Sequence, residues 1–553
     1  MFDLSITISS ILILLVLYLV SEITLYLIYK ITQRKGFFRD KSISQYPIFS
    51  KNFLKIGVFG GSAAAGYNAE INFSTILQHE LRHANNSRQK PLVMNFASSG
   101  MPFHDGQAEI LKEFLPYFDL TIIYAGNNEN LHYLTSTGAL FIDKDTLQTN
   151  ITINNQRNRK RMRFFTLERV VSNSNTANFL IRILRLLKLK IGNPVEISYQ
   201  NDQTNIQEDI LIDAVTTNPI ITLDKRIQIE QLFLDDLTDI SNQAALLRKK
   251  VLVVGMVNND LFSPSQSHVS KTSDKKEINA VLQNVKSRIA KSDYDTSLKI
   301  LNQLSSKFGN ISAINHLQAL TQLKLNNLPE AVQHINNCFD NSTEIIGRSC
   351  YRLRTAINSI CSESESMDYL DINSDIHEFL KNPSEYSQLF RDVQHLSSLG
   401  HIVLGFRLLN YVCNNSKGFY DMPRTSLYDF QALVDKEIEY FDQFKVSQSQ
   451  IDDHNFLSFR WSLSCSLYSS NKEEYVAQAR WYIDKWWQSV KSNVCRSEYL
   501  FWQGTAAYIN GELDLAKQYL QDGGKINKKN IEHLLNKRGA SGKLWKDRLS
   551  SIL

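Results

Sequence analysis

A serine follows two glycines at the end of a short apolar run, in the stretch KIGVFGGSAAAGYNAE between Lys55 and Glu70. A serine is a weak nucleophile until a nearby base takes its proton and a third group orients that base. A serine that opens a helix also has backbone N–H groups beside it, which suit an oxyanion. The same features suit a plain helix cap, so Ser62 alone leaves catalysis and capping open as alternatives.

A candidate base and its orienting acid lie far along the chain, in the stretch FRDVQHLSSLGH that begins at Phe390. Asp392 and His395 are three residues apart, so the carboxylate can reach the imidazole and fix its tautomer. The other ring nitrogen is then free to accept a proton from a serine. A rival acidic stretch, IDDHNF at 451–456, lacks this spacing before its histidine, and we set it aside.

Two further apolar runs end in turns that are rich in glycine and asparagine. LVMNFASSG ends at Gly100, and YAGNNEN contains Asn128. A backbone N–H and a side-chain amide are both neutral donors that suit an oxyanion. Each stretch alone is typical of an ordinary turn, because Gly and Asn dominate turns.

The elements around these residues alternate between strand and helix. Apolar runs at 54–60, 92–100 and 119–129, and a later one at 249–259, are separated by polar segments that include helix-like stretches at 74–83 and 105–114. Such alternation predicts an α/β fold with a parallel sheet. In parallel sheets the site lies at the carboxyl ends of the strands, and the first three runs end there in Gly- and Asn-rich turns.

Together the serine block, the two turns and the D-x-x-H pair resemble the SGNH hydrolases, also called GDSL-type esterases. The resemblance implies a three-layer, flavodoxin-like domain with Ser62 as nucleophile, His395 as general base and Asp392 as its orienter. It implies that Gly100, Asn128 and the Ser62 N–H form the oxyanion hole. No metal or cofactor is expected, because no other cluster of His, Cys and Asp has metal-ligand spacing. The resemblance covers roughly residues 50–130, 249–260 and 385–412.

This resemblance implies a serine esterase or deacylase that acts on acyl esters, such as acetylated sugars or lipid esters, through an acyl-enzyme. The same site would be an acyltransferase if an acceptor hydroxyl replaced water. A hypothesis of another class is a helical-repeat scaffold whose hydrolase domain has lost activity. The intact set of five residues favours an enzyme over the scaffold.

The N-terminus predicts a membrane anchor. Leu4 to Tyr29 is apolar apart from Ser, Thr and Glu22, and as a helix it would span about 39 Å, enough to cross a bilayer. The start is Met-Phe-Asp and no small-residue cleavage site follows, which is unlike a signal peptide. The basic flank from Lys30 to Lys41 favours a cytoplasmic body, although large domains can be translocated, so the side stays open.

Two basic stretches precede the fourth strand: RNRKRMRFF at 157–165 and the helix-like NFLIRILRLLKLKIG at 178–192. The second is either an amphipathic helix packed on the domain or an interfacial helix on anionic lipid.

Helix pairs follow the fourth strand. Residues 294–304 and 328–338 match at an offset of 34, the period of tetratricopeptide repeats, and 499–520 looks similar. Such arrays bind protein partners or brace a neighbour. The predicted domains are an anchor at 1–30, a hydrolase domain at 50–276 that resumes at 381–412, inserted helices at 277–380 and a C-terminal helical region at 413–553.

Composition sets the remaining bounds. A chain of 553 residues is too long for one core and predicts two or three domains. Its net charge of +5 gives no indication of nucleic-acid binding, and no such partner is expected. The six cysteines form no C-x-x-C pair, so neither a zinc site nor a thioredoxin-type motif is indicated.

Overall fold

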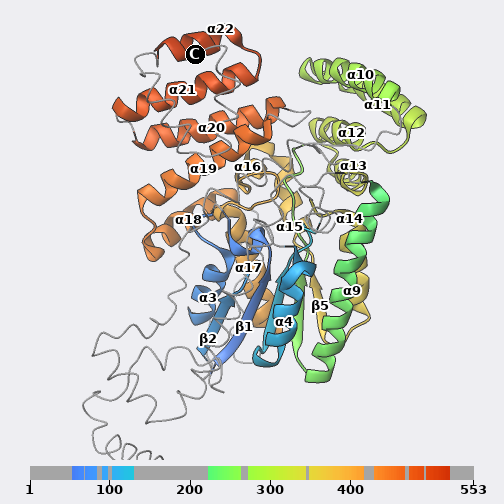
Figure 1. Cartoon of the computed structure of the whole chain (residues 1–553), viewed down its shortest axis with the longest axis vertical. Coiled ribbons are helices and arrows are strands. Elements are labelled where there is room, and N and C mark those ends of the chain that lie inside the picture. The colour runs from blue at the N-terminus through green and yellow to red at the C-terminus, as the bar shows by residue number, and fades with distance from the viewer. Residues whose placement is uncertain are drawn as a thin grey trace, which may run out of the picture.

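The computed structural model describes residues 53–67, 69–83, 90–97, 102–129, 222–262, 272–343, 348–415, 429–466, 472–490 and 493–522. Within them a five-stranded, all-parallel sheet has the order β2-β1-β3-β4-β5 (Figure 1). The strands are β1 (Phe53–Gly60), β2 (Lys90–Asn95), β3 (Leu120–Tyr124), β4 (Lys250–Val254) and β5 (Met367–Leu370). The chain is therefore α/β, as the alternation of apolar runs predicts.

The strand order creates a switch point between β1 and β3. From β1 the chain moves outward to β2 and then crosses to β3 on the other side of β1. The connections after neighbouring strands leave in opposite directions at such a point, which opens a crevice at their carboxyl ends. Ser62 follows β1 and Asn128 follows β3, so both lie at this crevice.

Helices cover the sheet in two groups. Helix α3 (Phe73–His83) packs on α17 (Ser398–Asn415), while α4 (Ala108–Phe114), α9 (Leu223–Leu247) and α14 (Tyr351–Ser362) form the other group. Their inner faces join the strands in one hydrophobic core, because strands of a parallel sheet are buried on both sides. Burial of all five residues of β3 shows this directly.

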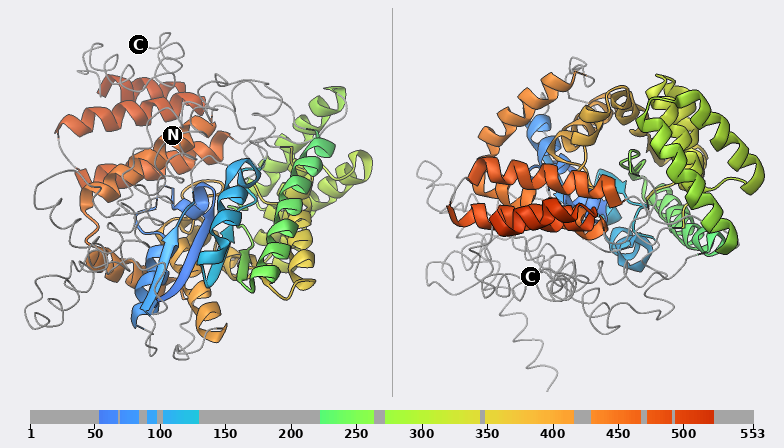
Figure 2. Two further views of the ribbon diagram at one scale, coloured as in Figure 1. Left: turned by 60° about the horizontal axis from the view of Figure 1, so that its bottom comes forward. Right: turned by 90° about the horizontal axis from the view of Figure 1, so that it is seen from above.

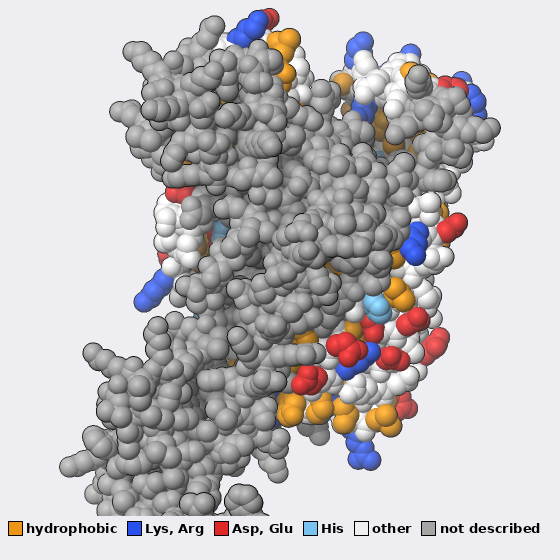
Figure 3. All heavy atoms as spheres, in the orientation of Figure 1, with side chains coloured by type: hydrophobic (Ala, Val, Ile, Leu, Met, Phe, Trp, Pro, Cys, Tyr) orange, Lys and Arg blue, Asp and Glu red, His pale blue; other side chains and the backbone are white. Residues whose placement is uncertain are grey.

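The outer surface of α4 and α9 carries charges of both signs (Figure 3). Lys112 of α4 lies 3.0 Å from Asp236 and 3.4 Å from Asp239, both on α9. These partly exposed ion pairs connect two neighbouring helices at the solvent side. Each contributes about 0–1 kcal/mol to the free energy of unfolding. The apolar inner faces of the helices therefore dominate their packing.

Two helical regions lie beyond the sheet, side by side at the same end of the molecule (Figures 1 and 2). The first follows β4 with α10 (Thr272–Ala290), α11 (Tyr294–Phe308), α12 (Ser312–Lys324) and α13 (Leu328–Asp340). The second follows α17 with α18 (Phe430–Phe444), α19 (Gln448–Ser466), α20 (Lys472–Val490), α21 (Asn493–Ile509) and α22 (Leu513–Asp522). Shorter helices are α2 (Ser62–Ala65), η3 (Phe103–Gln107), η4 (Leu115–Tyr117), α15 (Asn373–His377), η5 (Glu378–Lys381) and α16 (Pro383–Gln388).

The 34-residue offset corresponds to real helix starts. Helix α11 begins at Tyr294 and α13 at Leu328, and the matched small residues Ser297 and Ala331 are both fully buried. Small buried residues let neighbouring helices approach closely. The helical character of this segment is therefore as predicted, while its membership of the tetratricopeptide family stays a prediction.

The predicted boundary of the inserted helices differs from the structure in one respect. Residues 277–380 were expected to be a helical insertion, but β5 lies within this range and pairs with β4. Helix α14 likewise packs on β5 and α9. The strand escaped prediction because it has only four residues, of which three are half-buried.

Several predictions fall outside the described residues: the anchor at 1–30, the basic stretches at 157–165 and 178–192, and Gly100. Within the described ranges, none of the helices combines the length and the apolar character that crossing a bilayer requires. That finding leaves the predicted anchor untested.

Candidate active site

Ser62 is the first residue of a four-residue helix, α2, which begins directly after β1. The capping position belongs to Gly61, which has extended backbone angles, and no side chain caps the helix. The N–H groups of the first helical turn have no partner within the helix. The interpretation of Ser62 as a plain cap is therefore wrong, and its hydroxyl is available for another partner.

Glycine makes the strand-to-helix turn possible at two points. A β-carbon on Gly60 would lie 2.0 Å from the carbonyl oxygen of Tyr124 and 2.8 Å from the Ala64 β-carbon. Gly66 ends α2 with a φ of 77°, in the left-handed region that favours glycine. The turn that presents Ser62 is thus fixed by close packing of β1 on β3.

We expect Gly60→Ala to disrupt this turn. The added methyl group must push β3 or α2 away, at a cost of about 1–3 kcal/mol in the free energy of unfolding, and should displace Ser62. The measurement is urea unfolding combined with reactivity of Ser62 toward a fluorophosphonate. Gly309→Ala is the matched control, because Gly309 also has positive φ (81°) but a β-carbon there would meet no described atom within 4 Å.

His395 and Asp392 stand beside Ser62, although 333 residues separate the serine from the histidine. The His395 Nε2 atom lies 2.7 Å from Ser62 Oγ, and the His395 Nδ1 atom lies 2.6 Å from Asp392 Oδ2. All three residues are buried, with exposed fractions of 5%, 4% and 1% for Ser62, His395 and Asp392. Burial strengthens these polar contacts because it removes competing water.

The loop that carries the pair is held by its own hydrogen bonds. Asp392 Oδ1 accepts from the backbone N–H of Gln394 (2.9 Å) and of His395 (2.8 Å), which leaves Oδ2 for the imidazole. The N–H of Arg391 donates to the carbonyl of His395 at 2.7 Å and closes the loop. Asn259, after β4, donates its own N–H to the Val393 carbonyl at 2.9 Å.

This arrangement can transfer a proton away from a serine. When the Asp392 carboxylate accepts the Nδ1–H, the imidazole lone pair lies on Nε2 and faces the serine hydroxyl. Ser62 Oγ–H then donates to Nε2. A group that takes the proton while Oγ attacks an electrophile is the basis of nucleophilic catalysis.

Asn128 follows β3 at the same crevice. It is 5% exposed, and its amide nitrogen has no hydrogen-bond partner among the described residues. A buried donor without a partner is costly, and such donors occur where a ligand or ordered water completes them. Sequence reasoning missed that its neighbour Asn127, 2% exposed, shares this property within the described part. The adjacent Asn pair in YAGNNEN was the available signal.

Two aromatic rings near His395 were not predicted. The Tyr67 ring centroid lies 5.0 Å from the His395 ring, where it flanks the imidazole.

The second ring is that of His401, which stacks on Phe73 with 5.8 Å between the ring centroids. Burial, aided by the nearby His395, lowers the pKa of His401 to about 3. His401 is therefore neutral near pH 7 and adds no positive charge against the base.

A buried ion pair, also missed from the sequence, joins the two halves of the site. Arg391, next to Asp392, pairs with Glu70, whose other oxygen accepts from the Ser398 hydroxyl at 2.6 Å. Burial alone would raise the pKa of Glu70, but Arg391, His454 and Ser398 outweigh it and hold the pKa below 4.5. Both charges are thus kept in the interior.

The C-terminal helices supply further contacts to the Glu70–Arg391 pair. Asn455 of α19 accepts from Arg391 Nη1 at 3.1 Å, and His454 Nδ1 lies 3.9 Å from Glu70. Tyr482 of α20 places its ring 5.7 Å from the Arg391 guanidinium. Two residues of the rival stretch IDDHNF, His454 and Asn455, therefore face the Glu70–Arg391 pair. This stretch supports the loop that holds Asp392.

No protein-family model matches the chain, and no curated protein matches it. Among the described residues, no group of three or more His, Cys, Asp or Glu side chains is placed to hold a metal ion.

Proposed function

We propose that the protein is a serine esterase or deacylase that resembles the SGNH hydrolases and acts on acyl esters. The observation that carries the proposal is the hydrogen-bonded series Ser62–His395–Asp392, with contacts of 2.7 and 2.6 Å between the consecutive side chains. These distances already match those needed for proton transfer in a nucleophile–base pair.

The proposed reaction has two steps. Ser62 Oγ attacks the ester carbonyl carbon while its proton moves to His395 Nε2, and the tetrahedral intermediate collapses as the alcohol leaves with that proton. Water then attacks the acyl-enzyme, giving its proton to His395, and the acid is released as Ser62 regains its proton. Asp392 holds the imidazole tautomer and stabilises its positive charge in both steps.

The oxyanion of each intermediate needs hydrogen-bond donors. The amide nitrogen of Asn128, which has no partner in the described part of the chain, and the N–H of Ser62, at the start of α2, support such a role. Gly100 is proposed as the third donor from the resemblance alone. If an acceptor hydroxyl takes the place of water, the same residues transfer the acyl group.

The inactive-scaffold hypothesis is less well supported. An inactive scaffold would gain nothing from a buried serine, histidine and aspartate that are hydrogen-bonded in series. Buried polar side chains lower the stability of the fold unless they are fully paired or serve a function. We therefore keep the enzyme as the proposal. Its membrane attachment and any protein partner of the helical regions remain predictions from the sequence.

Covalent labelling tests the proposal. A fluorophosphonate should attach to Ser62 in the full chain, and mass mapping should find the adduct on that residue. Ser62→Ala should abolish labelling. Ser312→Ala is the matched control, because Ser312 is fully buried and its hydroxyl has no partner in the described part of the chain. A wild-type chain that folds but takes no label would contradict the proposal.

A further inference from the structure

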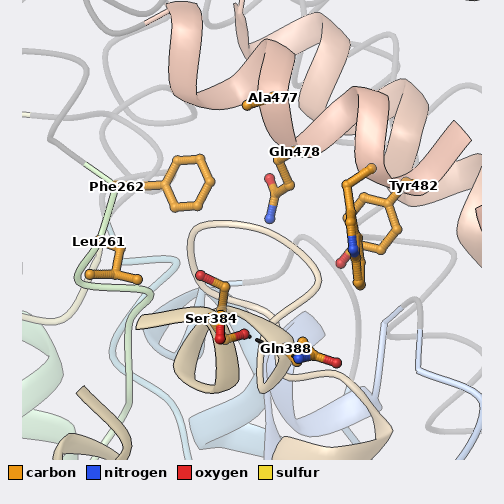
Figure 4. A pocket seen from close by; sticks show the side chains of 9 residues that line it. Leu261, Phe262, Ser384, Gln388, Ala477, Gln478 and Tyr482 are labelled. Carbon is orange, nitrogen blue, oxygen red and sulfur yellow. Dashed lines mark hydrogen bonds between the residues drawn. The ribbon is translucent and has the colours of Figure 1, made fainter. Parts of the chain in front are cut away.

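A pocket of about 440 Å³ lies between the sheet domain and the C-terminal helices (Figure 4). Leu261 and Phe262, from the segment after β4, line one side. Ala477, Trp481 and Tyr482 of α20 line the opposite side. Its volume is within the range of small-molecule sites.

The chemistry of the walls favours an uncharged, apolar ligand. No Asp, Glu, Lys, Arg or His is among the described residues that line the pocket. Two of its polar side chains are already engaged: Gln478 Oε1 accepts from Ser462 at 2.9 Å, and Ser387 Oγ donates to the Pro383 carbonyl at 2.8 Å. A phosphate or carboxylate would find no countercharge on these lining residues; the Lys485 ammonium lies beside the pocket, 3.9 Å from the Trp481 ring centroid.

The pocket walls are continuous with the loop that carries Asp392 and His395. Phe262 packs with Val393, which lies between those two residues, and with Tyr475 of α20. The Tyr482 hydroxyl donates to the Phe390 carbonyl at 3.1 Å, at the start of the same loop. Two residues that line the pocket, Phe262 and Tyr482, therefore contact the loop that carries Asp392 and His395.

We propose that this pocket binds the hydrocarbon chain of an acyl ester whose carbonyl reaches Ser62. The inference rests on the proposed function and adds the substrate class: esters with chains of about eight carbons or more. Helix α20 supplies four of the nine residues that line the pocket and belongs to the C-terminal helical region. That region would then select the substrate, besides any role in binding a partner.

Trp481 provides a direct readout of occupancy. Its side chain is 38% exposed, and the Lys485 ammonium lies 3.9 Å from its ring centroid. A bromine atom quenches tryptophan fluorescence on contact. We therefore expect 11-bromoundecanoate to quench the full-length Ser62→Ala chain, and bromoacetate not to. The saturable part of the quenching should disappear in Ser62→Ala/Trp481→Phe.

Filling the pocket tests specificity. Ala477→Phe should weaken bromoundecanoate binding by about tenfold or more and lower kcat/KM for decanoate esters equally, with acetate esters changed less than twofold. Ala245→Phe, on the exposed side of α9, is the matched control.

Quenching that is absent, independent of Trp481 or unaffected by Ala477→Phe would overturn the inference. Fluorophosphonate labelling separates the two proposals, because a labelled chain without such binding contradicts only the pocket assignment.

Discussion

Replacing Asp392 by asparagine is expected to reduce kcat for ester hydrolysis on the order of 10,000-fold while leaving the fold intact. Asparagine keeps an oxygen for the two backbone N–H groups, of Gln394 and His395, that Asp392 Oδ1 now accepts. Its amide nitrogen would face His395 Nδ1, and an amide donates where the carboxylate accepts. The imidazole would then carry its proton on Nε2 and could not take one from Ser62.

His395→Ala removes the base itself and should lower kcat at least as much, because members of such a series act as a unit. The measurement is hydrolysis of a short-chain nitrophenyl ester together with the rate of fluorophosphonate labelling. His104→Ala is the control. Its Nδ1 also lies 2.7 Å from an aspartate, Asp236, but in a partly exposed contact between η3 and α9. If Asp392→Asn kept more than a tenth of the activity, the assigned roles would be wrong.

The triad could be predicted because each part has a local signature. The D-x-x-H spacing places acid and imidazole within reach of one another, and the glycines before Ser62 indicate a tight turn at a strand end. The parallel sheet then brings the ends of β1 and β3 together, but His395 lies at a sequence separation of 333 from Ser62, in the loop between α16 and α17. The pairing of His395 with Ser62 was implied by the resemblance to the SGNH hydrolases and not by local spacing.

The surroundings of the triad could not be predicted in this way. Glu70 and Arg391 are 321 residues apart, and neither stands in a pattern that points to the other. Their pairing depends on how α19 and α20 pack over the loop, which is tertiary information. The same holds for the apolar pocket, since Phe262 and Trp481 come from segments that the sequence places in different regions.

Loss of the buried Glu70–Arg391 pair should cost far more stability than loss of a partly exposed ion pair. Arg391→Met would leave the Glu70 carboxylate buried without its guanidinium, at a cost of about 3–5 kcal/mol in the free energy of unfolding. Urea unfolding of the full chain measures this. Arg480→Met is the control, because Arg480 pairs with Glu512 in a partly exposed site and should cost at most about 1 kcal/mol.

The double variant Arg391→Met/Glu70→Gln distinguishes a buried-charge effect from lost packing. Removing both charges should restore much of the stability, since the penalty comes from an unpaired charge in the interior. Activity should recover less, because Glu70 also accepts from Ser398, at the start of α17, and Arg391 positions the loop before Asp392. Equal recovery of stability and turnover would mean that the pair supports only the fold. Recovered stability with a lower kcat and an unchanged KM would assign Arg391 a positioning role in the chemical step.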